Sequence, residues 1–98
     1  MSISDADIAF AKELFAPLGD VSSRKMFGGI CLYLEGDIFA LVSKDGQIYL
    51  KAQGDLANEL AADGTGRFHN MPYWGIPDAA LDDPEVACQL AKRTIASL

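Results

Sequence analysis

The feature that most constrains the fold is a stretch in which apolar residues recur with a period of two and the linking segments are short. Residues 30–34, 38–42 and 47–52 each alternate as a β-strand does, and glycine-containing segments of three to four residues separate them. Links of this length cannot make the crossover that parallel strands require. Together with a strand-like segment from about Ser23, they predict an antiparallel meander sheet of about four to five strands.

The middle of these three runs is apolar at every position. Strict alternation predicts one strand face with Ile38, Ala40 and Val42. Phe39 and Leu41 then belong to the opposite face. A strand that is apolar on both faces is expected either to be covered on both sides or to be central in the sheet with a partner on its second face.

Before the strands, the apolar period is that of a helix. Residues 5–16 are predicted to form an amphipathic helix, with Ser4 as its N-cap and Asp7 at the capping-box position. Pro17 and Gly19 are expected to end it, because proline lacks a backbone N–H and glycine accepts a left-handed cap. The apolar stripe of this helix consists of Ile8, Ala11, Leu14, Phe15 and Leu18.

Two further helices are predicted after the strands. Asp55 is the expected N-cap of a short middle helix, and Asp83 followed by Pro84 marks the start of a C-terminal helix. Residues 64–77 contain too many glycines and prolines for a helix but enough apolar residues to pack across the domain. The buried positions are expected to be Leu56 and Leu60 in the middle helix, and Ala87, Leu90, Ala91, Thr94, Ile95 and Leu98 in the last. The predicted fold class is α+β, with two layers.

The length and the charge of the chain limit the functions that it can have. The chain has 98 residues, half of them hydrophobic, which is enough for one compact domain, residues 1–98. Its 8 basic and 14 acidic residues give a net charge of −6, which disfavours nucleic-acid binding and suits a partner with a basic surface. The N-terminus lacks the features of a signal peptide and no apolar run is long enough to span a membrane, so we expect a cytoplasmic protein that does not bind membranes.

The sequence offers little for catalysis or metal binding. His69 is the only histidine, and no zinc, phosphate-loop or calcium motif is present. Cys31 and Cys88 are predicted to be reduced, buried side chains. The alternatives are a disulfide between them and a cysteine nucleophile with His69 as its base. The expectation is a protein without enzyme activity, cofactor or metal.

Two glycines and several aromatic and basic residues form the candidate interaction surface. Gly28 and Gly29 between apolar segments indicate a bulge, a kink or a close approach of another backbone or a ligand. Alternation places Tyr49 and Lys51 on one outward strand face, where the alternative is an ordinary solvated surface. The full candidate surface is Arg24, Lys25, Phe27, Gly28, Gly29, Tyr49, Lys51, Tyr73 and Trp74. For Trp74, the alternative is a packing anchor in the core.

These motifs, taken in order, resemble the N-terminal domain of the TfoX/Sxy competence regulators. The matching segments are residues 14–19 (LFAPLG), 24–29 (RKMFGG), 32–33, 39–42 (FALV), 48–51 (IYLK), 71–74 (MPYW), 76–77 and 81–85 (LDDPE). The resemblance implies a two-layer α+β fold with a curved antiparallel sheet and flanking helices. It also implies no enzyme activity and a role in bacterial transcriptional regulation through protein partners.

Two departures from the family pattern affect these expectations. Competence regulators of this kind carry a second, C-terminal domain, whereas this sequence ends with the helix at Leu98, so a stand-alone copy is expected. The segment between Asp63 and Met71 is also short compared with the strand pair that the family has there. The last hairpin is therefore expected to be reduced or missing.

The leading hypothesis is a non-catalytic regulatory domain that binds another protein, or a second copy of itself, through the candidate surface. The first alternative is a nucleic-acid-associated domain that uses a local basic patch of Arg24, Lys25, Lys44, Lys51 and Arg67. The second is a small enzyme with an unrecognised site. Net charge opposes the first alternative, and the lack of a catalytic motif opposes the second.

Overall fold

The sheet predicted from the alternating segments is present in the computed structural model, which describes residues 3–26, 28–63, 66–69 and 71–97. Its five strands are antiparallel and follow one another in chain order across the sheet. They are β1 (Val21–Met26), β2 (Gly29–Leu34), β3 (Asp37–Val42), β4 (Ile48–Lys51) and β5 (Tyr73–Gly75). β3 is the central strand, as expected from its apolar residues. The predicted α+β class is confirmed.

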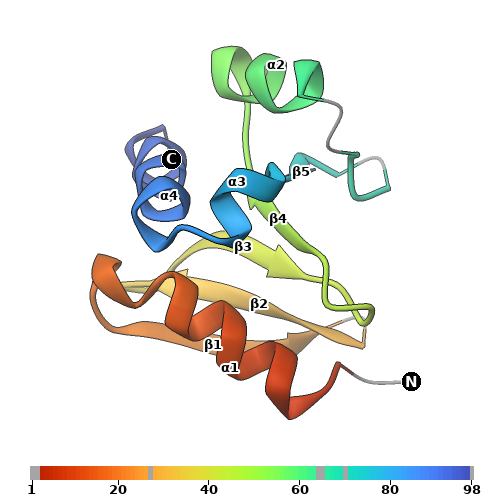
Figure 1. Cartoon of the computed structure of the whole chain (residues 1–98), viewed down its shortest axis with the longest axis vertical. Coiled ribbons are helices and arrows are strands. Elements are labelled where there is room, and N and C mark those ends of the chain that lie inside the picture. Colours follow the sequence, from red (N-terminus) through yellow and green to blue (C-terminus); the bar gives the residue numbers. More distant parts are fainter. Residues whose placement is uncertain (1–2, 27, 64–65, 70, 98) are drawn as a thin grey trace.

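The helices form the second layer. In Figure 1, α1 and α3 lie in front of the sheet, with α4 beside them and α2 at the top of the view. Their bounds are α1 (Asp5–Leu14), α2 (Gly54–Ala62), α3 (Asp78–Leu81) and α4 (Pro84–Ala96), and a 3₁₀ turn, η1 (Ala16–Leu18), follows α1. Each of the four helices contributes a buried side chain to one apolar core with the facing strands, for example Leu14, Leu60, Ala80 and Ala91. The helices thus cover a single face of the sheet.

The N-terminal helix begins as predicted but ends earlier. The Ser4 hydroxyl accepts a hydrogen bond from the backbone N–H of Asp7 at 3.1 Å, which makes Ser4 the N-cap. The α-helix stops at Leu14, two residues before the predicted end. Pro17 does not end it, because it lies inside the 3₁₀ turn η1, near the start of a helix where its missing N–H costs no hydrogen bond. Gly19 then leaves the helical region with a φ of 132°.

The later helices include one that the sequence analysis missed. Asp83 caps α4 as predicted, since its carboxylate accepts a hydrogen bond from the N–H of Glu85 at 3.0 Å. Asp55 does not cap α2; Gln53 holds the N-cap position and Asp55 lies in the first turn, where the helix dipole favours a carboxylate. The four-residue helix α3 is too short to leave a periodic signal.

A bulge in β3 overturns the alternation expected there. Cross-strand partners are Ala40 with Leu32 and Ile38 with Tyr33, so the pairing register shifts and Phe39 is left without a partner in β2. One extra residue in a strand moves the following side chains to the other face. Phe39 therefore packs in the main core with Ala40, while Ile38 lies on the opposite face.

Gly28 and Gly29 have different roles in the turn between β1 and β2. Gly28 is exposed and has a φ of 80°, a conformation that favours glycine. Gly29 is buried, and a Cβ atom placed on it would lie 1.9 Å from the carbonyl oxygen of Val42. The expectation of a close backbone approach is confirmed at Gly29.

The two cysteines are buried, unpaired and on opposite faces of the sheet. The Cys88 thiol donates to the carbonyl oxygen of Leu14 at 3.5 Å on the helix side. The Cys31 thiol donates to the Met26 sulfur at 3.6 Å on the other side. Because the sheet lies between them, a disulfide would require the fold to open. Among the described residues, no helix is both long and apolar enough to cross a membrane.

Burial of these thiols predicts a loss of stability in alkaline solution. Burial raises the pKa of Cys31 and of Cys88 above the ordinary 9.0, and it also raises the pKa of Tyr73. As pH rises above about 9, the unfolded chain therefore loses these protons before the folded chain does. The free energy of unfolding keeps its full value below that pH and falls above it. Urea denaturation at pH 7.5, 9.5 and 10.5 measures the decline. The double variant Cys31→Ala, Cys88→Ala should decline less steeply, and an equal slope would assign the effect to other groups.

Candidate functional site

The sheet face opposite the helices, here called the outer face, is the main candidate site. Paired residues of antiparallel strands lie on the same face, so the register follows one row from Arg24 through Cys31 and Leu41 to Tyr49. The residues of the outer face are Ser22, Arg24, Met26, Cys31, Tyr33, Ile38, Leu41, Tyr49, Lys51 and Tyr73. This face brings together four members of the predicted surface: Arg24, Tyr49, Lys51 and Tyr73.

A second, small apolar cluster lies on the outer face. Cys31, Leu41 and Tyr73 are buried there, and Tyr33, Ile38 and Tyr49 are half-buried around them. Among the described residues, the only covering outside the strands comes from Phe68 and Met71, which precede β5. The ring of Phe68 meets that of Tyr49 edge-on, with centroids 5.3 Å apart. Most of the outer face therefore has no second layer within the described segments of the chain.

Near its β1 edge the outer face presents an apolar side chain to solvent. Met26 is 39% exposed, one of two large hydrophobic side chains that are exposed among the described residues. The other is Phe10 on α1, which is 47% exposed and lies on the helical side of the molecule. Single exposed apolar residues are normal on protein surfaces. Met26, however, contacts Cys31 and so adjoins the apolar cluster that contains Tyr33. Met26 thus lies at the edge of this apolar cluster.

Charges are distributed unevenly between the two layers. The charged residues of the outer face are Arg24 and Lys51, both basic. Lys25 pairs with the core residue Ile30 and therefore points to the helical side. Asp37 points to the same side, because it pairs with Leu34, which packs against the core. The acidic residues within helices are Asp5, Asp7, Glu13, Asp55, Glu59, Asp78 and Glu85. The net charge of −6 therefore does not describe the outer face.

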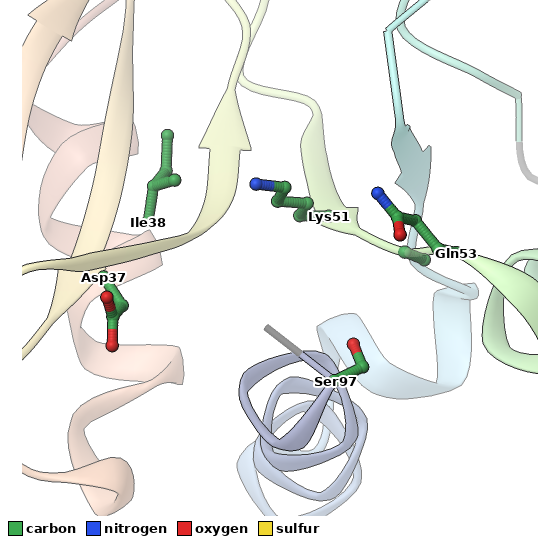
Figure 2. A pocket seen from close by; sticks show the side chains of 6 residues that line it. Asp37, Ile38, Lys51, Gln53 and Ser97 are labelled. Carbon is green, nitrogen blue, oxygen red and sulfur yellow. The ribbon is translucent and has the colours of Figure 1, made fainter.

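A cleft opens where β3 and β4 separate. The two strands are paired only from Ala40 with Leu50 to Val42 with Ile48, and beyond Ala40 the bulged end of β3 leaves β4. Figure 2 shows Lys51 extending from β4 towards Ile38 across this gap, with Gln53 and Ser97 nearby. The cleft has a volume of about 350 Å³. Asp37, Ala52 and Ser97 also line it, so the cleft lies at the end of the sheet between the outer face and the helical side.

Tyr73 and Trp74, predicted as a pair, point in opposite directions. Tyr73 belongs to the outer face and is 6% exposed. Trp74 packs against the main core on the helical side, and the guanidinium carbon of Arg67 lies 5.1 Å from the centre of its ring. Arg67 also forms an isolated antiparallel bridge with Trp74, which is the reduced form of the last hairpin that the sequence predicted. The two aromatic residues therefore cannot contact one partner as a unit.

The rest of the predicted surface is divided. Lys25 is exposed on the helical side, and Gly28 is exposed in the turn beside it. Gly29 is buried, so it shapes the turn and is not available for contact. Phe27 lies outside the described residues. Met26, Tyr33 and Ile38 were not selected from the sequence, although the alternation of Cys31 with Tyr33 was a usable signal for one of them.

The groups considered for catalysis are two buried thiols and an exposed imidazole. No group of three His, Cys, Asp or Glu residues within the described segments could hold a metal ion. Burial raises the pKa of both thiols, which favours the unreactive protonated form over the nucleophilic thiolate. His69 is exposed, and its ring contacts Phe68 with centroids 4.5 Å apart.

Comparison with protein families agrees with this architecture. Residues 13–98 match the TfoX N-terminal domain. No curated protein matches the sequence significantly. The match begins near the end of α1 and includes the whole sheet, the outer face and the three later helices. The chain therefore belongs to the TfoX N-terminal domain family.

Proposed function

We propose that this protein is a non-catalytic regulatory domain, similar in role to the competence regulators of its family, and that it binds another protein through the outer face. The observation that carries the proposal is the absence, among the described residues, of a helix over this half-buried apolar cluster. Aromatic side chains and methionine are typical of interface centres, and Tyr33, Tyr49 and Met26 supply them here. A partner would supply a covering layer for the outer face, which has none from the helices among the described residues.

The charges of the outer face specify the chemistry of that partner. Arg24 and Lys51 lie at opposite ends of the face, on β1 and β4. A complementary partner therefore has an apolar centre with acidic groups at its rim, contrary to what net charge alone would indicate. A second copy of the chain would need to present its acidic helical side, which gives a head-to-tail contact and not a symmetric pair.

The test compares two exposed apolar residues on opposite sides of the molecule. Met26→Asp should weaken capture of the partner from extracts of the source cell about tenfold or more, because it puts a carboxylate into the proposed interface. Phe10→Asp, the matched control on α1, should leave capture unchanged. Thermal melts first show that both variants fold. Quantitative mass spectrometry of crosslinked complexes then measures how much partner each variant captures. If Phe10→Asp reduced capture of the partner and Met26→Asp did not, the interface would lie on the helices.

The aromatic and basic composition of the outer face also favours a second candidate, binding of single-stranded nucleic acid. Bases can stack on aromatic rings while Arg24 and Lys51 contact phosphates. Fluorescence anisotropy with a labelled single-stranded oligonucleotide, repeated over a range of salt from about 50 to about 300 mM, separates the two functions. Affinity that falls steeply with salt and is abolished by Lys51→Glu would favour nucleic acid over protein.

A further inference from the structure

A second hollow lies beside the outer face, between the β3–β4 turn and the segment that precedes β5. We call it the loop pocket. Its volume is about 610 Å³, which is within the range of small-molecule sites. Its lining includes Lys44, Asp45, Tyr49, Arg67, Phe68 and His69.

The loop pocket combines aromatic walls with a local excess of basic groups. Tyr49 and Phe68 meet edge-on at 5.3 Å, and the His69 ring lies edge-on to Phe68 at 4.5 Å. Lys44 and Arg67 contribute two positive charges against the one negative charge of Asp45. This excess occurs in a chain whose net charge is −6.

The segment that forms one wall of the pocket is fixed by several contacts. The Arg67 side chain donates from Nε to the carbonyl oxygen of Met71 at 2.8 Å and stacks over Trp74. The backbone N–H of Phe68 donates to the carbonyl of Tyr73 at 2.9 Å. These contacts hold the aromatic and basic groups in place before a ligand arrives, which reduces the entropy lost on binding.

We propose that the loop pocket binds a small aromatic anion, meaning a planar ring that carries one phosphate or carboxylate group. The ring packs against Tyr49 and Phe68, and the anionic group faces Lys44 and the basic edge of the pocket. Neither part suffices by itself: a free anion lacks the apolar contact, and a neutral ring lacks the charge. Tyr49 and Phe68 also belong to the apolar cluster of the outer face, but the inference stands on the lining of the loop pocket and does not depend on the protein interface.

The test uses phenyl phosphate as the probe. Two-dimensional ¹H–¹⁵N NMR titration of the whole chain should show saturable shifts confined to residues around the pocket. Inorganic phosphate and benzyl alcohol, which each carry half of the recognised chemistry, should bind about tenfold more weakly. Saturation by inorganic phosphate with the same affinity would overturn the aromatic part of the proposal. Shifts that do not saturate, or that lie elsewhere, would overturn the site.

Two charge-neutralising variants make the assignment specific. Lys44→Gln should weaken phenyl phosphate binding about fivefold or more, since Lys44 is exposed and its replacement removes a charge without disturbing the core. Lys92→Gln makes the same change in net charge on α4, away from the pocket, and should leave binding unchanged. Equal weakening by both variants would show that the probe responds to total charge, and the loop pocket would not be its site.

Discussion

Replacing Gly29 by alanine is expected to lower the free energy of unfolding by about 3 kcal/mol, the upper part of the usual range for overpacking a tight site. The added Cβ would lie 1.9 Å from the carbonyl oxygen of Val42 and 3.0 Å from the carbonyl carbon of Ser43. Both atoms belong to the backbone, so no rotation of a side chain relieves the clash. Either β2 or the end of β3 must move, and both contribute to the core through Ile30 and Val42. Chemical denaturation of the purified variant measures the loss.

Two other glycines separate the steric effect from general effects of the substitution. Gly66→Ala adds a methyl group with no atom within 4 Å, so its stability should stay close to that of the wild type. Gly36→Ala also meets open space, but its φ of 86° makes alanine strained, and we expect a loss of about 1 kcal/mol. If Gly29→Ala were no more harmful than Gly36→Ala, close approach would not be the reason for glycine at position 29.

The glycines at 28 and 29 show how far a sequence motif can be interpreted. The motif predicted a bulge, a kink or a close approach, and the close approach occurs at Gly29, while Gly28 adopts a positive φ in the turn before it. Its neighbours Arg24 and Lys25 looked like one basic patch in the sequence. They point to opposite faces, because adjacent residues of a regular strand without a bulge do so. Tyr73 and Trp74 are also neighbours on a strand, so the same rule divides them between the two faces.

Other features could not be obtained from the pattern. β2, β3 and β4 were predictable because short links and a period of two admit one arrangement, whereas β5 follows β4 only after α2 and was not predicted as a strand. Leu56 and Leu60 were correctly placed in the core. The bulge at Phe39 was not predictable from the sequence. Every residue around it is apolar, so a shifted register produces the same pattern of apolar residues. The loop pocket was also hidden, because Lys44 and Arg67 are 23 positions apart (67 − 44) and only the pairing of β4 with β5 brings their segments together.

The bulge places Phe39 in the core, where its truncation is expected to cause the second large loss of stability. Phe39→Ala is expected to lower the free energy of unfolding by about 3–5 kcal/mol, as for other buried aromatic residues. The Phe39 side chain is fully buried and meets the ring of Phe15 edge-on, with centroids 5.3 Å apart. Truncation would leave a cavity between β3 and the end of α1 and would remove this aromatic contact. Thermal or urea denaturation followed by circular dichroism measures it.

Ile38 provides the control that tests the position of the outer face. Strict alternation would put Ile38 in the main core and Phe39 outside it, whereas the bulge puts Ile38 beside Tyr33 in the half-buried outer cluster. Ile38→Ala should therefore cost less than half as much stability as Phe39→Ala, because the cost of truncation follows burial. If Ile38→Ala proved the more damaging of the two, the register shift would be absent. Phe39 would then replace Ile38 on the outer face, and the cleft beside Lys51 would lose the residue across from it.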